Sequence, residues 1–317
     1  MGRVLTVLVV LIIATSGFFY LQKRQNSLFS PIPKVFGIAK SPQVNKWFPK
    51  EDYFLFDKKD SSLIISAQSA LIVDYETANI IFQKQKNTRL PVASTVKIMT
   101  ALVALENAKL KDAFSVSEKA ASIGENSMGL TSGEKLTLEE LLYGLMLVSG
   151  NDAAVTIAEG VAKTEENFVK MMNDTAVSLG LKNTKFINAS GLDDDNNAQY
   201  STAYDLAVIA HYIWEKYPEF RDITATINKP IEATKDHKAF NLNNETNLLT
   251  TYPGVRGIKP GFTWEAKLCL VTYAENSNKK LLAVILGSDD RRGEMKELLD
   301  YGFSRYGIKI EHPVLDM

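Results

Sequence analysis

Short β-rich runs lie near both ends of the chain, and residues between them recur with a helical period. Residues 63–73 and 79–83 flank the polar stretch 74–77, which predicts a hairpin. The elements expected, in chain order, are strands at 63–73 and 79–83, helices at 91–106, 137–148, 152–161, 165–179 and 202–215, strands at 268–275 and 280–287, and a helix at 293–301. This order predicts an α+β fold whose antiparallel sheet is formed from both chain ends, with a helical subdomain.

The chain begins with an apolar segment of nearly membrane-spanning length. Val4 to Leu21 is almost uninterrupted apolar sequence, flanked by Arg3 and by Lys23 and Arg24. A signal peptide cleaved near 14–16 is the alternative, although apolar residues follow that point. We expect an anchor or signal peptide at 1–21, a proline-punctuated linker and lead-in at 22–62, a folded domain at 63–308 and a tail at 309–317.

Composition and charge exclude several classes of function. A net charge of -1 and a pI near 6.4, without a local basic cluster, argue against nucleic acid as a partner. Cys269 is the single cysteine, which excludes an internal disulfide and a multi-cysteine metal site. The histidines, at 211, 237 and 312, lack metal-ligand spacing, and the acidic run 193–197 lacks the glycine of a calcium loop. No metal is expected.

A serine and a lysine stand three residues apart at the start of the helix expected at 91–106. Such residues share a helix face, with Cβ atoms about 5–6 Å apart, so the Lys97 amine can reach the Ser94 hydroxyl. A serine nucleophile that uses a lysine base needs this spacing. Free backbone N–H groups at the helix start favour an oxyanion there. A capping serine beside a solvated lysine would give the same pattern, so this motif alone does not decide.

Two further polar motifs lie far along the chain from the first. Ser149-Gly150-Asn151 interrupts two apolar helices and could supply a second hydroxyl for proton relay and an amide for a substrate carbonyl. Lys259-Pro260-Gly261 precedes an expected strand, where a second cation would lower the pKa of Lys97 and attract a carboxylate. The alternatives are an ordinary interhelical turn and a surface turn.

Together with their flanks, these motifs resemble the D-alanyl-D-alanine carboxypeptidases, which are low-molecular-mass penicillin-binding proteins of peptidase family S11. The resemblance covers about 66–303. It is carried, in order, by LPVASTVKIMTALVALE, LTLEELLYGLMLVSGNDAAVTIAE, FINASGLDDDNNAQYSTAYDLA, YPGVRGIKPGFTWEAKLCLV and RRGEMKELLDYGF. It implies a β-lactamase/transpeptidase-like fold, with 63–308 as the penicillin-binding D,D-peptidase domain.

The resemblance implies a catalytic role for three residues. Ser94 would attack the carbonyl between the two terminal D-alanines of a peptidoglycan stem peptide, with Lys97 as general base. Ser149 would relay the proton, and the acyl-enzyme would then be hydrolysed. β-Lactam antibiotics would acylate the same serine as covalent inhibitors. No metal or organic cofactor is implied.

The resemblance also implies a substrate-binding set, which is Asn151, Lys259, Gly261, Phe262 and Arg291. Asn151 would hold the substrate's amide carbonyl, and Lys259 would supply positive charge. The oxyanion hole would be the backbone N–H groups of Ser94 and Phe262. Arg291 would bind the terminal carboxylate. Its sequence distance to Tyr301-Gly302-Phe303 in the closing helix fits the family better than that of its neighbour Arg292.

One position departs from the family's pattern. The third motif is usually Lys-Thr-Gly, and Pro260 replaces the threonine, which removes a hydroxyl and a backbone N–H. Our hypothesis is weaker selection for a free C-terminal carboxylate. A D,D-endopeptidase of crosslinks and a catalytically silent β-lactam- or muropeptide-binding protein are therefore the alternatives. A β-lactamase is disfavoured because no Glu-x-x-Leu-Asn motif follows Ser149 to Asn151.

The resemblance also implies a location. Peptidoglycan lies outside the cytoplasmic membrane, so the catalytic domain is expected in the bacterial cell envelope, on the extracytoplasmic face of that membrane. Because the chain ends soon after the last family block, membrane attachment is expected to rest on residues 4–21. Cleavage of that segment would instead release a secreted protein.

Overall fold

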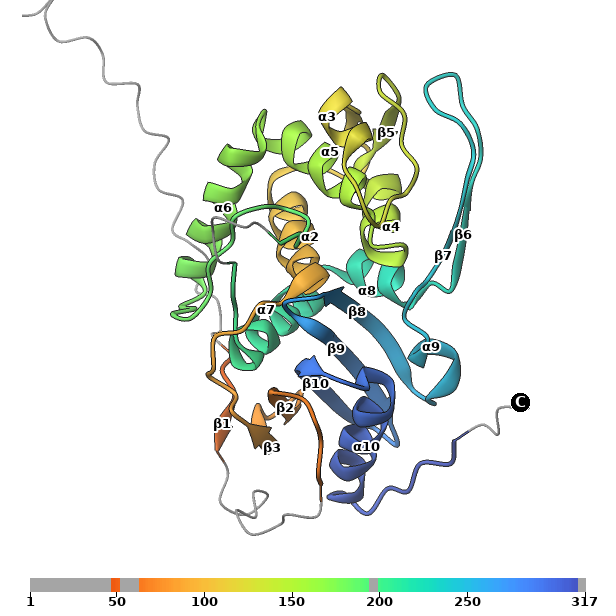
Figure 1. The fold of residues 1–317 in the computed structure, drawn as a ribbon. Coiled ribbons are helices and arrows are strands. Elements are labelled where there is room, and N and C mark those ends of the chain that lie inside the picture. Colours follow the sequence, from red (N-terminus) through yellow and green to blue (C-terminus); the bar gives the residue numbers. More distant parts are fainter. Residues whose placement is uncertain (1–46, 52–62, 194–198, 313–317) are drawn as a thin grey trace, which may run out of the picture. The chain divides into compact units, whose positions relative to one another are not determined.

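The computed structural model describes residues 47–51, 63–193 and 199–312 (Figure 1). The apolar segment expected to be an anchor or signal peptide, at 4–21, lies outside these ranges, as does most of the expected linker. In the ranges that are described, no helix is both long enough and apolar enough to cross a bilayer.

A six-stranded sheet with the strand order β1-β3-β2-β10-β9-β8 forms the centre of the described residues. Its strands are β1 (Lys50–Glu51), β2 (Ser69–Asp74), β3 (Asn79–Lys84), β8 (Val255–Thr263), β9 (Lys267–Asn276) and β10 (Lys279–Ser288). The predicted hairpin is β2–β3, and β10 pairs antiparallel with β2, from Leu281 opposite Asp74 to Leu286 opposite Ser69. Every pairing in this sheet is antiparallel except that of β1 with β3.

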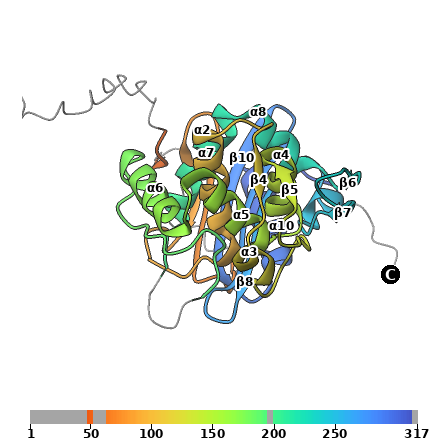
Figure 2. The same ribbon diagram turned by 90° about the horizontal axis from the view of Figure 1, so that it is seen from above.

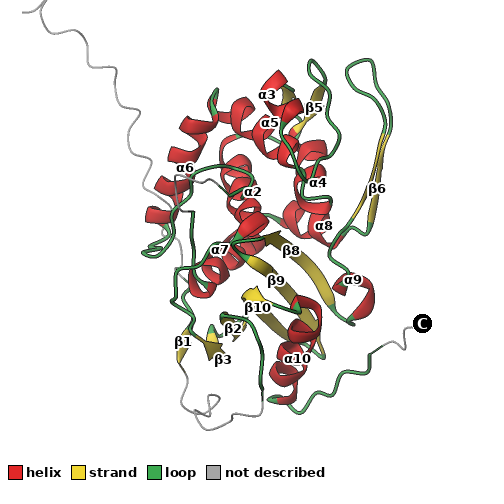
Figure 3. Ribbon diagram, viewed as in Figure 1, coloured by secondary structure: helices red, strands yellow, loops and turns green. Residues whose placement is uncertain are grey.

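Helices cover both faces of this sheet. One face carries α10 (Arg291–Ser304), and the other carries α7 (Ala203–Lys216) and α8 (Pro218–Ala225) (Figures 1 and 3). A helical part continues beyond α7, seen from above in Figure 2, and consists of α2 (Lys97–Asn107), α3 (Glu118–Ser122), α4 (Leu138–Leu147), α5 (Asn151–Ala162) and α6 (Glu165–Ser178). The predicted α+β fold, with its sheet from both chain ends and its helical subdomain, is confirmed.

The helices that the sequence predicts begin and end within a few residues of the observed ones. Thr137 caps α4 as expected, because its hydroxyl accepts from the Glu140 N–H at 3.3 Å while the Glu140 carboxylate accepts from the Thr137 N–H at 2.8 Å. The sequence did not predict α8 or several short elements. These are β4 (Ala113–Ser115), β5 (Lys135–Thr137), β6 (Asn228–Ile231), β7 (Phe240–Asn243) and α9 (Leu248–Thr251), together with β1 and α3. The longer strand β8 was not predicted either.

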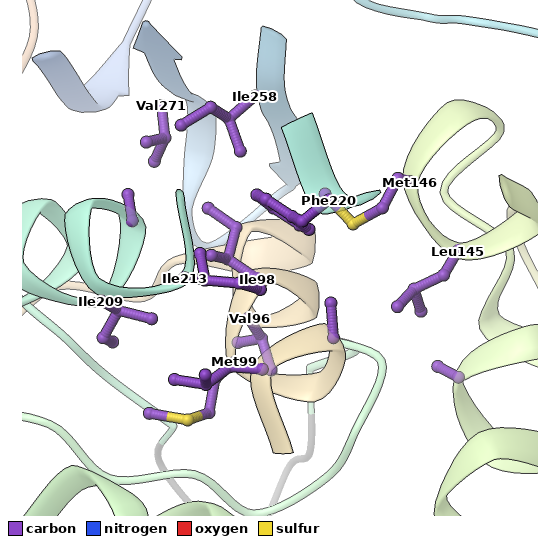
Figure 4. Close-up of a cluster of buried hydrophobic side chains, with 14 of the residues drawn as sticks. Val96, Ile98, Met99, Leu145, Met146, Ile209, Ile213, Phe220, Ile258 and Val271 are labelled. Atoms are coloured by element: carbon purple, nitrogen blue, oxygen red, sulfur yellow. The ribbon is translucent and has the colours of Figure 1, made fainter. Parts of the chain in front are cut away.

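The central helix α2 is buried around its whole circumference. The sequence suggested a buried stripe of Ile98, Leu102, Val103 and Leu105, but every residue from 97 to 105 is buried. A helix that is apolar on all sides belongs inside a core. Figure 4 shows Ile98 and Phe220 of α8 on the side of α2 that faces Ile258 and Val271 of the sheet, with Val96 nearer to Met99. A second apolar cluster lies between the sheet and α10, and includes Ile72, Leu281, Met295 and Phe303.

Residues from the expected linker and tail pack on this fold. The Trp47 indole stacks on His211 of α7 with ring centroids 4.0 Å apart, and its N–H donates to the Tyr75 carbonyl at 3.0 Å. Burial lowers the pKa of His211 to about 4, so this ring is neutral at physiological pH. At the other end, His312 lies 2.8 Å from the Asp300 carboxylate. Ordered contacts therefore extend past both ends of the range 63–308.

Candidate active site

Ser94 lies on a tight turn that precedes α2. The residues Ala93–Val96, here called the nucleophile turn, form a 3-10 helix rather than the first α-helical turn that the sequence predicted. Ala93 has a φ of 47°, a left-handed conformation that is rare for alanine. The Thr95 hydroxyl steadies the turn by donating to the Val92 carbonyl at 2.7 Å. Local strain of this kind is typical of functional sites.

The Lys97 side chain is completely buried beside Ser94. Its Nζ lies 2.9 Å from the Ser94 Oγ, 2.7 Å from the Asn151 Oδ1 and 2.5 Å from the Ser190 carbonyl oxygen. Burial, and next the positive charge of Lys259, hold the pKa of Lys97 well below the usual lysine value. The neutral form of the amine is therefore favoured more than in an ordinary lysine.

The three neighbours of the Lys97 Nζ determine the orientation of its N–H groups and lone pair when the amine is neutral. A neutral amine has two N–H donors and one lone pair. The Asn151 Oδ1 and the Ser190 carbonyl can only accept, so they take both N–H groups. The lone pair is left for the third neighbour, the Ser94 hydroxyl, which can donate. The geometry thus places a base on the proton of Ser94.

Ser149 and Asn151 reach the same site from the junction between α4 and α5. Ser149 has a φ of 58°, is 3% exposed and lines the cleft that holds Ser94. The Asn151 Nδ2 donates to the Gly124 carbonyl at 3.0 Å, which leaves its second N–H for another acceptor. Within the described residues, no hydrogen bond joins the Ser149 hydroxyl to Lys97 or Lys259.

Lys259 lies inside β8, not before a strand as the sequence suggested. Its side chain is fully buried, and its Nζ has no hydrogen-bond partner among the described residues. Burial, opposed by Glu245 and assisted by the nearby Arg291 charge, lowers the pKa of Lys259 to about 8. Lys259 is consequently a desolvated cation at neutral pH.

Pro260 reveals the direction of the neighbouring backbone groups. β8 is an edge strand that pairs with β9 alone, and Pro260 lies opposite Leu270 with no N–H to donate. Because N–H directions alternate along an antiparallel strand, residues 260 and 262 share one orientation. We infer that the Phe262 N–H points away from β9, towards the open edge of the sheet. The side chain of Phe262 itself is 48% exposed.

Two glycines lie directly against the nucleophile turn. A Cβ atom at Gly261 would lie 3.0 Å from the Ser94 nitrogen, so β8 runs directly against the turn. A Cβ atom at Gly191, whose φ is 91°, would lie 2.2 Å from the Ala93 carbonyl oxygen. Both positions need glycine because backbone approaches backbone there.

Arg291 is the first residue of α10 and reaches back to β8. Its guanidinium donates to the Gly261 carbonyl at 2.9 Å, and burial lowers its pKa. The cleft between these elements has a volume of about 690 Å³. The residues that line it are Ser94, Glu125, Asn126, Ser149, Asp193, Glu245, Pro260, Gly261, Phe262, Thr263, Trp264 and Arg291. Arg292, the less favoured alternative, is not among these lining residues.

The chain is similar to known proteins in both sequence and structure. The family model described as D-alanyl-D-alanine carboxypeptidase matches residues 57–290. The chain belongs to the D-alanyl-D-alanine carboxypeptidase family. It is 39% identical to the carboxypeptidase DacF of Bacillus subtilis over 82% of this chain and 67% of DacF. It is 34% identical to DacA of Haemophilus influenzae over 68% of this chain but only 56% of DacA, so the chain spans little more than half of that relative.

Solved structures show the same likeness. The DD-transpeptidase of Streptomyces K15 superimposes with a TM-score of 0.71 at 31% identity, over 76% of this chain and 98% of that one. The carboxypeptidase DacD from Francisella tularensis gives a TM-score of 0.69 at 28% identity, over 80% of this chain and 74% of that one. Members of this family are serine hydrolases of the bacterial envelope that act on D-Ala-D-Ala ends of peptidoglycan and bind β-lactams. The predicted family, fold and enzyme class are confirmed.

Sequence reasoning missed a buried carboxylate that holds this carboxypeptidase site together. Asp152 is 1% exposed and accepts from the backbone N–H groups of Met128 at 2.8 Å and of Gly129 and Leu130 at 2.9 Å. It thereby fixes the loop that carries Asn126 into the cleft. An acidic residue in the first turn of an apolar helix, directly after Asn151, was the available signal.

Two other contributors to the site were also missed. The Ser190 carbonyl, which orients Lys97, is a backbone group and leaves no trace in the residue pattern. Glu245 lines the cleft, accepts from the Asn126 Nδ2 at 2.9 Å, and opposes the lowering of the pKa of Lys259. It stands in a polar stretch before α9, where nothing in the sequence distinguishes it from a surface residue.

Proposed function

We propose that this chain is a serine-type D-Ala-D-Ala carboxypeptidase, which removes the terminal D-alanine of peptidoglycan stem peptides through an acyl-enzyme on Ser94. The observation that carries the proposal is the fully buried Lys97 amine, whose Nζ lies 2.9 Å from the Ser94 Oγ and whose pKa is lowered by burial. Membership in the carboxypeptidase family supports the choice of substrate.

The proposed reaction begins when Ser94 attacks the carbonyl of the penultimate D-alanine and Lys97 takes its proton. Negative charge develops on the carbonyl oxygen, which the N–H groups of Ser94 and Phe262 would stabilise. Ser149 relays the proton from Lys97 to the departing nitrogen, and D-alanine leaves. Water, activated by the same lysine, then attacks the ester, and the shortened peptide is released. Lys97 returns the proton of this water to the Ser94 oxygen, so both residues end in their starting protonation states.

The remaining residues of the cleft are proposed to hold the substrate. Asn151 has one N–H to offer to the substrate's amide carbonyl. Lys259 supplies a desolvated positive charge close to the reacting carbonyl. Gly261 allows β8, along whose edge the substrate would bind, to lie against the nucleophile turn. Arg291 is placed to bind the terminal carboxylate, and its contact with the Gly261 carbonyl sets its position.

One experiment tests this assignment. The purified protein is incubated with uncrosslinked and with crosslinked muropeptides, and the products are separated by mass. We expect release of D-alanine from uncrosslinked pentapeptides at the higher rate. Ser94→Ala is expected to lower that rate by roughly a millionfold, because a nucleophile cannot be replaced by its neighbours. A fluorescent penicillin should label the parent covalently and should leave Ser94→Ala unlabelled.

Pro260 gives the endopeptidase alternative a specific basis. The buried proline lacks the hydroxyl and N–H of a threonine, and Arg291 is left with more of the carboxylate recognition. Faster cleavage of the crosslinked muropeptides in the same digest would favour the endopeptidase. An absence of both cleavage and penicillin labelling would favour a silent binding protein.

We further propose that residues 63–308 form the D,D-peptidase domain, preceded by a linker, and that residues 4–21 attach it to the outer face of the cytoplasmic membrane. The apolar length of that segment and its flanking charges support this topology. Fractionation of cells that express the full chain tests it. Recovery of the intact, uncleaved chain in the soluble extracytoplasmic fraction would contradict the anchor.

A further inference from the structure

Glu245 brings a negative charge into a cleft that is proposed to bind a carboxylate. This residue lies between β7 and α9 (Figure 1), and it lines the cleft together with Ser94, Ser149 and Arg291. Its exposed carboxylate accepts from the Asn126 Nδ2 at 2.9 Å and, among the residues that the structure describes, forms no ion pair. A carboxylate without a cation partner weakens an anion-binding site that it faces.

Hydrogen bonds fix Glu245 on the side of the cleft where the leaving group would depart. Its backbone N–H donates at 3.0 Å to the carbonyl of Leu147, the last residue of α4, two positions before Ser149. The Asn126 carbonyl accepts from the Asn151 N–H at 2.8 Å. Glu245 is thus tied, directly and through Asn126, to the junction that carries Ser149, the residue proposed to hand a proton to the departing nitrogen.

The charge of Glu245 acts on all three cations of the site. Burial is the main cause that lowers the pKa of Lys97, Lys259 and Arg291. The negative charge of Glu245 opposes this lowering at each of them. The Lys259 Nζ has no hydrogen-bond partner within the described residues, and Arg291 donates to a backbone carbonyl, that of Gly261. Glu245 therefore cancels part of the positive potential that would attract a C-terminal carboxylate.

We propose that Glu245 is a specificity-determining residue, whose carboxylate weakens selection for a free C-terminal carboxylate and lets the site also cleave D,D-peptides that end in an uncharged amide. An amide is not repelled by Glu245 and gains little from Arg291. The effect is separate from that of Pro260, because Glu245 acts through charge and Pro260 through missing hydrogen-bonding groups. This inference deepens the proposed carboxypeptidase function and rests on it.

The test compares diacetyl-L-lysyl-D-Ala-D-Ala with its C-terminal amide, and measures kcat/KM for cleavage of the last peptide bond. Glu245→Gln removes the charge but keeps a side-chain oxygen that can accept from Asn126. We expect this variant to raise the ratio of the acid to the amide about tenfold, because one like charge near the bound carboxylate is gone. In 1 M salt, where the Debye length is about 3 Å, the gain should fall to roughly twofold.

The pH profile gives a readout that a merely structural role would not move. Because the charge of Glu245 opposes the lowering of the pKa of Lys97, Glu245→Gln should lower that pKa further. The acidic limb of kcat/KM for the amide peptide should then move to lower pH. Glu125, Asp152 and Lys259 also act on Lys97 and stay in place, so the limb should move by less than about one pH unit.

Two further variants make the outcome decisive. Glu245→Asp keeps the charge and should keep the parent ratio within about twofold. Glu297→Gln removes an exposed negative charge from α10, outside the cleft, and should change neither the ratio nor the pH profile. An unchanged ratio in Glu245→Gln, with both peptides cleaved, would overturn the role of Glu245 but not the carboxypeptidase. Failure of the parent to cleave either peptide would instead overturn the proposed function.

Discussion

Replacement of Lys259 by methionine is expected to abolish activity and, at the same time, to stabilise the fold. The Lys259 ammonium is fully buried without a hydrogen-bond partner among the described residues, and methionine fills similar space without a charge. The free energy of unfolding should rise by about 1–3 kcal/mol, because an unpaired buried cation is removed. The rate of acylation by a penicillin should fall by about a thousandfold, the effect of losing one group that stabilises the transition state.

The pH dependence of acylation gives a second readout for the same residue. Lys259 is cationic below its pKa of about 8, so the parent should lose activity as the pH rises above that value. Arginine at this position stays charged, so Lys259→Arg should extend any residual activity to higher pH. In Lys259→Met the pKa of Lys97 should rise, because a neighbouring positive charge is gone, and the acidic limb should move to higher pH. Chemical denaturation and stopped-flow labelling provide the two measurements.

An exposed lysine serves as the matched control. Lys170 lies on the surface of α6, and Lys170→Met removes one positive charge without touching the cleft. It should change neither the labelling rate nor the pH profile. A decrease in the free energy of unfolding of Lys259→Met, as large as the decrease caused by a core cavity, would contradict the conclusion that burial of this ammonium destabilises the fold.

Replacement of Gly191 by alanine is expected to displace the nucleophile while leaving the chain folded. The new methyl group would lie 2.2 Å from the Ala93 carbonyl oxygen, a backbone atom that can move only with the nucleophile turn. A displacement of about 1 Å at a reacting group can lower a rate a hundredfold. We therefore expect penicillin acylation to slow by about two orders of magnitude, as measured by the rate of fluorescent labelling.

Gly133→Ala separates this effect from the conformational preference of glycine. Gly133 has a φ of 88°, close to the 91° of Gly191, but a Cβ atom there meets nothing within 4 Å. Both variants should lose about 1 kcal/mol of stability from the left-handed backbone. Only Gly191→Ala should lose acylation. Equal labelling rates in the two variants would show that the turn tolerates the added methyl group.

Much of the site follows from sequence because its chemistry lies in side chains at short spacing. Ser94 and Lys97 are neighbours on any helical turn, so the change from α to 3-10 geometry leaves them in contact. The prediction that Lys259 precedes a strand was wrong, because this residue lies inside β8. Proline and glycine have low strand propensity, so the presence of Pro260 and the adjacent glycine kept β8 from being predicted as a strand.

The groups of the site that the sequence could not reveal are backbone groups or side chains whose partners are distant in the sequence. The Ser190 carbonyl reaches Lys97 only because Gly191 lets that loop lie against the nucleophile turn. Asp152 binds N–H groups about two dozen positions earlier in the chain, and any acidic residue at a helix start gives the same local signal. Such partnerships depend on tertiary structure and have no periodicity of their own.

The pairing of β2 with β10 has a consequence for biogenesis. The strand β2 (Ser69–Asp74) pairs with β10 (Lys279–Ser288), which is synthesised much later. The β2–β3 hairpin therefore leaves the ribosome long before its partner strand does. Loop closure over about 200 residues is slow, and an open apolar edge invites wrong pairing in the interval. Folding should therefore be completed after synthesis, and a chain truncated before residue 279 should aggregate instead of forming a smaller stable core.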